Sequence, residues 1–130
     1  MWPVPTVQPG GTLDIIYYES QEVPTADNPE CVVNVVFPNV FRVGPRNSLV
    51  DTFWARSTNG GNTFSAPVKI TTATSNWCTT VSGIGPNFGD YISSFATADR
   101  VFACWSDGRN GVPDTFCAVI LGSKKRMRGQ

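Results

Sequence analysis

The sequence predicts an all-β fold. Its 130 residues include 12 glycines and 10 prolines, and the segments between these turn formers are rich in Thr, Val, Phe, Trp and Tyr, which favour strands. Apolar residues do not recur at helical spacing over any useful length. A chain of this size fits one domain with an adequate core. We expect that domain over residues 1–123, followed by a basic C-terminal tail at 124–130.

The charge balance argues against two classes of partner. The formal net charge is zero and only 15% of the residues are charged, so neither nucleic acid nor an anionic membrane is an expected partner. The basic run in the tail is expected to be solvated. No apolar run approaches the roughly 18 residues of a membrane span, and the N-terminus lacks the features of a signal peptide. A soluble chain is expected, in a compartment that the sequence leaves open.

Four strand-like segments form the first part of the chain. They occupy residues 2–7, 10–20 (a turn and then an alternating strand), 50–55 and 64–71. An insert at 21–49 separates the second from the third, and it contains a polar turn at 24–29 and a β-prone run at 31–37. We expect the four segments to form one antiparallel unit, over about residues 2–72.

The second part of the chain repeats this pattern. Its strand-like segments occupy residues 89–95, 98–107 and 113–118, and a fourth is missing. The pentapeptide Asp-Thr-Phe-Trp-Ala at 51–55 returns as Asp-Thr-Phe-Cys-Ala at 114–118, and the preceding strands align Tyr18 with Trp105. The sequence therefore predicts an internal repeat, with an incomplete second unit over about residues 76–121.

A tight hairpin turn is predicted between the third and fourth segments of the first unit. Asn59 can accept backbone N–H bonds within the turn, Gly60 and Gly61 can adopt positive φ, and Phe64 is expected to anchor the turn on the core.

This turn resembles the Asp-box of the sialidase-like (BNR-repeat) β-propellers. The matching positions are Ser57, Asn59, Gly61, Thr63 and Phe64, with Asn59 in place of the usual Asp. Segments 5–20, 89–91 and 105–111 resemble blade openings and hairpins of the same group. The resemblance implies that each four-stranded unit is a propeller blade, and it suggests a secreted or bacterial extracellular protein.

Two blades cannot close a ring, because propellers have about four to eight. Three explanations are open: three copies form the six-bladed ring typical of the family, the chain is a fragment of a longer protein, or the Val-rich insert caps the open side. Cyclic symmetry favours a homo-oligomer, and a trimer above other stoichiometries.

The cysteines predict one disulfide and no metal site. The four Cys have no CxxC spacing and the chain has no His, so neither a metal nor a cofactor is indicated. If the strands pair symmetrically about the turn at 108–113, Cys104 faces Cys117 within disulfide reach; the alternative is two reduced, buried thiols. Cys31 and Cys78 could form a second bridge, although nothing in the sequence sets their distance.

The resemblance also implies a catalytic set: three arginines that grip the substrate carboxylate, a Tyr nucleophile activated by Glu, and an Asp acid/base. The candidates are Arg42, Arg46, Arg109, Tyr17 and Glu19. Tyr17 and Glu19 share one face of a strand, whereas the residues around Arg42 resemble a family Phe-Arg-Ile-Pro motif with one residue inserted.

Each of these candidates also has a structural interpretation. Asp107 and Arg109 suit an ion pair that fixes a hairpin, Asp90 and Tyr91 suit the start of a strand, and aromatic residues such as Trp54 and Trp77 fit a core as well as a sugar-stacking platform.

Two functions follow. The favoured one is a non-catalytic module that assembles with itself and binds a glycan or another ligand, with Arg42, Arg46, Arg109 and Trp77 as ligand-binding candidates. The alternative is a sialidase-type glycoside hydrolase whose site is assembled across subunits or in a parent chain. The first is favoured because a full catalytic set is not convincing in this chain.

Overall fold

The computed structural model describes residues 3–20, 22–34, 40–81 and 91–122. Within these ranges all regular structure is strand, which confirms the predicted all-β class. The strands are β1 (Val4–Val7), β2 (Leu13–Ser20), β3 (Glu30–Asn34), β4 (Val40–Pro45), β5 (Leu49–Ser57), β6 (Val68–Lys69), β7 (Ser75–Asn76), β8 (Ser93–Ala96), β9 (Arg100–Asp107) and β10 (Asp114–Leu121). The tail at 124–130 lies outside the described residues.

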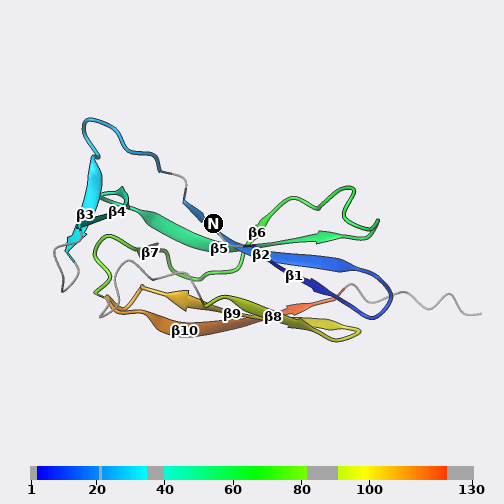
Figure 1. Ribbon diagram of the computed structural model, residues 1–130. Helices are drawn as coiled ribbons and strands as arrows, with labels where there is room; N and C mark the ends of the chain where they lie inside the picture. Colours follow the sequence, from blue (N-terminus) through cyan, green and yellow to red (C-terminus); the bar gives the residue numbers. More distant parts are fainter. Residues whose placement is uncertain (1–2, 21, 35–39, 82–90, 123–130) are drawn as a thin grey trace, which may run out of the picture.

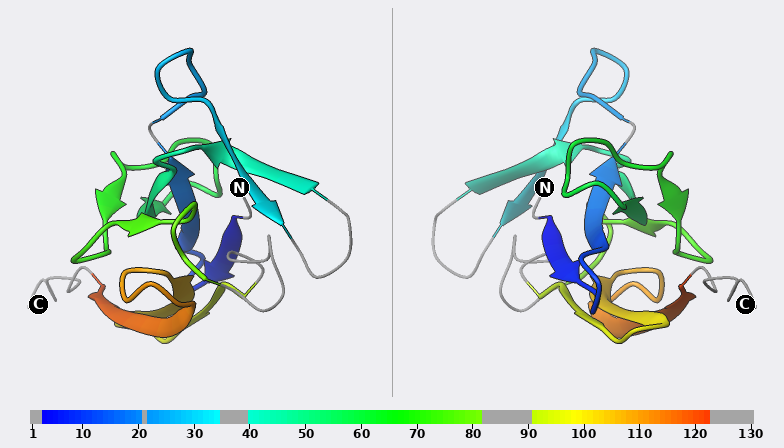
Figure 2. Two further views of the ribbon diagram at one scale, coloured as in Figure 1. Left: turned by 90° about the vertical axis from the view of Figure 1, so that its left-hand side faces the viewer. Right: turned by 90° about the vertical axis from the view of Figure 1, so that its right-hand side faces the viewer.

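The strands form two larger antiparallel sheets and one hairpin. The first sheet has the order β1-β2-β5-β6, and β7 also pairs with β5. The second sheet has the order β10-β9-β8. Figure 1 shows the two sheets stacked one above the other, with the β3–β4 hairpin standing at one end. This hairpin comes from the predicted insert, and Figure 2 shows it projecting beyond the two sheets.

Two element boundaries differ from the prediction. The fourth strand of the first sheet, expected over 64–71, is reduced to β6, because Pro67 just before it has no N–H to donate to β5. The two-residue β7 was not predicted. It lies where the second unit was expected to begin, yet it pairs with the first sheet.

The core lies between the two stacked sheets. The buried apolar side chains that pack together in this core are Ile16, Tyr18 and Val50 from the first sheet and Ala103 and Trp105 from the second. Burying a large apolar side chain contributes about 1.5–3 kcal/mol. The Tyr18 hydroxyl also joins the sheets, since it accepts a hydrogen bond from the Ser106 N–H (2.9 Å) and lies 3.3 Å from the Ser106 carbonyl oxygen.

The structure corrects the alignment of the internal repeat by one residue. In the second sheet, Trp105 lies opposite Phe116. In the shared pentapeptide the counterpart of Phe116 is Phe53. Phe53 lies opposite Tyr17, not Tyr18. Side chains alternate between the faces of a strand, so this shift moves the equivalent position to the other face of the first sheet. Sequence similarity matched two aromatic residues, but hydrogen-bond register decides which of them correspond.

Both cysteine pairs are disulfides. Cys104 and Cys117 lie directly opposite in the β9–β10 ladder, with Cα atoms 4.1 Å apart, as the symmetric pairing about the turn predicts. Cys31 and Cys78 are also joined, with Cα atoms 5.9 Å apart. The second bridge ties the start of β3 to the segment after β7.

The turn between β5 and β6 is held by its own side chains. Asn59 Oδ1 accepts hydrogen bonds from the Ser57 hydroxyl (2.9 Å) and the Thr63 N–H (3.0 Å), and Asn59 Nδ2 donates to Thr63 Oγ1 (2.8 Å). Gly61 has a φ of 89°, and its N–H donates to Ser57 Oγ. The expected anchoring by Phe64 is wrong, because this side chain is 43% exposed.

Removing the Asn59 side chain is expected to destabilise the protein by about 1–2 kcal/mol, because three hydrogen bonds of modest net value are lost. Asn59→Asp keeps the acceptor oxygen and should remain close to the wild type. Asn62→Ala is the matched control, since its side chain donates one hydrogen bond, to the Asn59 carbonyl. Urea unfolding of the three variants measures the difference, and equal losses for Asn59→Ala and Asn62→Ala would contradict the expectation.

Candidate functional site

A buried carboxylate organises the end of β9. Asp107 is 1% exposed. Its Oδ1 accepts hydrogen bonds from Ser75 Oγ (2.8 Å), Arg109 N (3.0 Å) and Arg109 Nε (2.9 Å). Its Oδ2 accepts from the Trp105 indole (3.0 Å) and Arg109 NH2 (2.6 Å). Burial alone would raise the pKa of Asp107, but these hydrogen bonds outweigh burial and hold the pKa well below its ordinary range.

Arg109, a predicted ligand-binding and catalytic candidate, is engaged by this cluster. Besides binding Asp107 it donates to Thr72 Oγ1 (2.7 Å), and its guanidinium lies 4.1 Å from the ring centre of Phe116. The hydrogen bond to Asp107 raises the pKa of Arg109, with burial acting in the opposite direction. These contacts favour the structural interpretation, in which the Asp–Arg pair fixes the hairpin.

The first sheet contains a similar cluster that the sequence analysis missed. Asp14 is fully buried and accepts hydrogen bonds from Gln8 Nε2 (2.8 Å), the Trp54 indole (2.7 Å) and Arg56 Nε (2.8 Å). The Arg56 guanidinium lies 4.9 Å from the centre of the Trp54 ring. The available signal was the single acidic residue in the otherwise apolar and aromatic run 13–18. Trp54 therefore has a structural partner and is not an open platform for a sugar.

Tyr17 and Glu19 lie on the same face of β2, as the alternation predicts, and this face points away from the second sheet. Tyr17 stacks on Phe53, with ring centres 6.0 Å apart. Burial, and then the charge of Glu19, raise the pKa of Tyr17 above 10.0. The phenol therefore stays protonated near neutral pH. When the β2–β5 and β9–β10 ladders are aligned by their paired residues, Tyr17 and Glu19 correspond to Trp105 and Asp107.

The carboxylate opposite Glu19 is also engaged. Asp51 accepts hydrogen bonds from Lys69 Nζ (2.7 Å), Thr71 Oγ1 (2.7 Å) and Thr74 Oγ1 (3.1 Å). This network connects β5 to the segment between β6 and β7. Asp51 lies on the same face of the first sheet as Tyr17, and Lys69 balances its negative charge.

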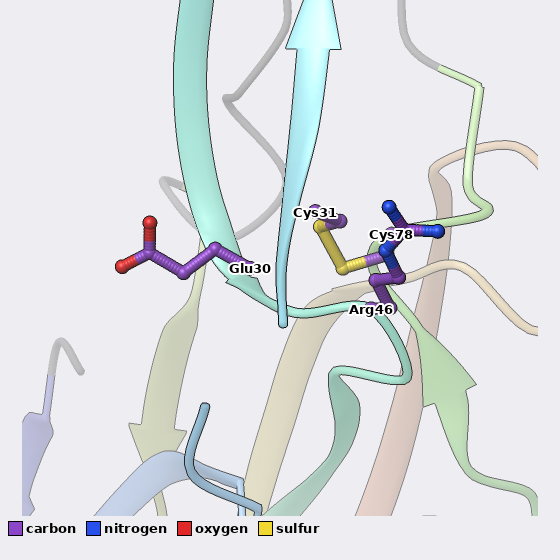
Figure 3. Close-up of a pocket in the computed structure, with 4 residues that line it drawn as sticks. All are labelled: Glu30, Cys31, Arg46 and Cys78. Atoms are coloured by element: carbon purple, nitrogen blue, oxygen red, sulfur yellow. A yellow bond between two sulfur atoms is a disulfide. The ribbon is translucent and has the colours of Figure 1, made fainter. Parts of the chain in front are cut away.

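A pocket of about 390 Å³ lies where the insert hairpin meets the rest of the chain. Its described lining residues are Glu30, Cys31, Arg46 and Cys78. In Figure 3 the Arg46 guanidinium lies beside the disulfide, whereas the Glu30 carboxylate points to the other side of β3. Arg46 has an exposed side chain, and its backbone N–H donates to the Pro29 carbonyl (2.8 Å). The disulfide and this backbone bond fix the position from which the guanidinium extends.

Three other predicted residues have different surroundings. Trp77 is half-buried and meets Tyr18 edge-on, with ring centres 5.2 Å apart, so it belongs to the core. Arg42 lies in β4 opposite Val32, and its side chain is outside the described part of the structure. Tyr91 is 81% exposed just before β8, and Asp90 lies outside the described residues.

Neither a metal-binding cluster nor a membrane-spanning helix is found among the described residues. These residues contain no group of three or more Cys, Asp or Glu side chains arranged to hold a metal ion. The described part of the chain also has no helix with the length and apolar character required to cross a membrane. Comparison of the whole chain with protein-family models, with curated proteins and with solved structures finds no match.

Proposed function

We propose that this chain is a non-catalytic Asp-box propeller module, related to the sialidase-like propellers, that assembles with further copies of itself and binds a carbohydrate. The observation that carries self-assembly is the open, apolar outer face of the second sheet. Its exposed side chains are Phe95 (63%), Phe102 (36%), Val119 (54%) and Leu121 (72%). A contiguous face of this kind is costly in water and marks an interaction surface.

Assembly through such faces fits the internal packing of the chain. The two sheets already bury apolar faces against each other, as neighbouring propeller blades do. Three copies would supply the six blades typical of the family that the sequence resembles, and cyclic closure would leave no sheet face open.

Carbohydrate binding is supported by the pocket at Arg46. An exposed guanidinium held next to a disulfide can grip a carboxylate through two parallel hydrogen bonds. An acidic sugar is therefore the expected ligand class. The insert, which the second unit lacks, supplies Glu30, Cys31 and Arg46 to the pocket, and Cys78 completes its described lining.

Hydrolysis is the alternative, and the Tyr17 environment argues against it. A tyrosine nucleophile needs its phenolate to be accessible, but burial and Glu19 raise the pKa of Tyr17. Arg109, one of the three candidate arginines, is engaged by Asp107 and Thr72. We therefore expect no release of a fluorogenic sialoside. Release that is lost in Tyr17→Phe would favour the hydrolase.

Calorimetric titration with sialyllactose is expected to detect binding that lactose lacks, and Arg46→Ala should weaken it at least tenfold, or about 1.4 kcal/mol. Arg100→Ala is the matched control, because Arg100 is an exposed arginine that pairs only loosely with Asp99 (3.4 Å). Binding that is unchanged in Arg46→Ala would exclude this pocket. Absence of binding to either sugar would remove the acidic-glycan part of the proposal.

A further inference from the structure

The two large sheets present opposite faces to each other. We define the back face of each sheet by its equivalent aromatic pair: Tyr17 and Phe53 in the first sheet, Trp105 and Phe116 in the second. These pairs occupy the same position in the β2–β5 and β9–β10 ladders. The opposite side of each sheet is its front face.

The contact within the chain is front to back. Ile16 and Tyr18 lie on the front face of the first sheet, and they pack in one core with Trp105, which lies on the back face of the second. The second sheet therefore buries its back face, whereas the back face of the first sheet points away from this contact. That face of the first sheet is partly exposed: Leu13, Ile15, Tyr17 and Phe53 are half-buried, and Ala55 is buried. The front face of the second sheet is open.

The open front face is apolar across all three strands of the second sheet. Phe95, Phe102 and Val119 lie opposite one another in adjacent strands, and the rings of Phe95 and Phe102 are 6.1 Å apart. The Cys104–Cys117 disulfide also bridges the two strands on this face. The charged Arg100 lies on the same face at the end of the patch, opposite Leu121.

The back face of the first sheet is apolar over part of its length. Along β2 it carries Leu13, Ile15 and Tyr17, and on β5 it carries Phe53 and Ala55, whereas Glu19 and Asp51 form its acidic end. The corresponding back-face positions of the second sheet include Val101 and Ala103, which are completely buried, and Ala103 packs in the core with Ile16 and Tyr18 of the first sheet. Within the chain, the back face of the second sheet is therefore covered by the front face of the first sheet.

We infer that a second copy of this chain seats the back face of its first sheet on the open front face of the second sheet, repeating the intrachain contact. The inference rests on the self-assembly part of the proposed function and adds which faces meet. A second copy is the expected occupant because it offers the same kind of surface that covers a front face within the chain. Such a contact is head-to-tail, so it can repeat from copy to copy and gives a ring when the rotation closes or a filament when it does not.

Mixing two blocked variants tests the pairing of faces. Phe102→Arg blocks the front face and Ile15→Arg blocks the back face. Each variant is expected to be monomeric alone by light scattering coupled to size exclusion, under oxidising conditions. An equimolar mixture should form a one-to-one dimer and nothing larger, because one intact front face and one intact back face remain. The wild type should form a larger assembly.

Val23→Arg is the matched control, since Val23 is 70% exposed and lies before β3, outside the strands of both sheets; it should assemble like the wild type. Thermal unfolding checks that every variant folds. Val119→Arg replaces an exposed side chain on the front face and can be used if Phe102→Arg fails to fold. Val7→Arg replaces an exposed side chain on the back face and can be used if Ile15→Arg fails to fold.

Three outcomes would overturn the inference. A monomeric wild type at tens of micromolar would remove self-assembly altogether, including that part of the proposed function. If Phe102→Arg and Ile15→Arg both assemble like the wild type, the chain self-assembles through other surfaces and the proposed contact between front and back faces is excluded. A blocked variant that still forms a dimer by itself would indicate a two-fold symmetric contact between identical faces. Sugar titration remains a separate readout in each case.

Discussion

Asp107→Ala is expected to lower the free energy of unfolding by about 3 kcal/mol. The substitution removes the acceptor for the Trp105 indole and for the Arg109 guanidinium, both within 3.0 Å of the carboxylate. The Arg109 side chain is only 14% exposed, so its charge is left without compensation in a largely dry environment. Breaking a buried pair by removing one partner typically costs about 3–5 kcal/mol. Urea unfolding measures the loss.

The same residue should make stability depend on acid pH. Burial acts to raise the pKa of Asp107, but the hydrogen bonds from Arg109, Trp105 and Ser75 lower it well below its ordinary value of 3.8. The unfolded chain therefore takes up the proton first as pH falls. This stabilisation is present above the unfolded pKa and is lost progressively as pH falls below about 4. The loss between pH 5 and pH 2 should be smaller in Asp107→Ala than in the wild type.

Asp99→Ala is the control for both measurements, because the Asp99 side chain is 72% exposed and its interactions are exposed ones, an ion pair with Arg100 (3.4 Å) and a hydrogen bond from Thr97 Oγ1 (3.0 Å). Exposed pairs of this kind contribute about 0–1 kcal/mol. Similar losses in Asp99→Ala and Asp107→Ala, or the same acid dependence in both, would refute the role assigned to the buried cluster.

Replacing Cys31 and Cys78 together with alanine is expected to cost about 4 kcal/mol of unfolding free energy. The bridge joins residues that are 47 positions apart. A disulfide lowers the conformational entropy of the unfolded chain, and this loss of entropy increases with the length of the loop that the disulfide closes. A further contact between this hairpin and the segment after β7 lies at the same junction, where the Cys78 sulfur meets the Pro45 carbonyl oxygen.

The other disulfide provides the comparison. Cys104 and Cys117 are 13 positions apart and lie within a continuous β-ladder, so replacing both is expected to cost about 3 kcal/mol. Unfolding of the two double variants without reductant gives the order directly. A larger loss from the Cys104/Cys117 pair would show that the junction of the insert matters less to stability than its loop length implies.

Local features were predictable where the interactions are close in sequence. The alternation of apolar residues in 13–20 and the Gly and Pro turns were sufficient for the all-β class. The Cys104–Cys117 bridge followed from symmetric pairing about a short turn, since a tight hairpin fixes its own register. The Asp-box-like turn has its bonding partners within four residues of Asn59. In these cases the residues that interact are also neighbours in the chain.

Features that depend on distant segments were not predictable. Asp14 lies in β2, but its partners Trp54 and Arg56 arrive from β5, beyond the insert. Tyr18 and Trp105 look equivalent in sequence, whereas the ladders make Tyr17 the counterpart of Trp105. The exposure of Phe64 likewise depends on where the sheets lie.

The sequence by itself determined the longer strands, the turns and the facing of Cys104 and Cys117, because periodicity, glycine conformation and hairpin symmetry are local properties. Only the tertiary structure decided which face of each strand is buried, which carboxylates receive hydrogen bonds, and which faces of the two sheets remain open. A shift of one residue in register exchanges the two faces of a strand at almost no cost in local propensity, and that choice is made by the packing of segments far apart in the chain.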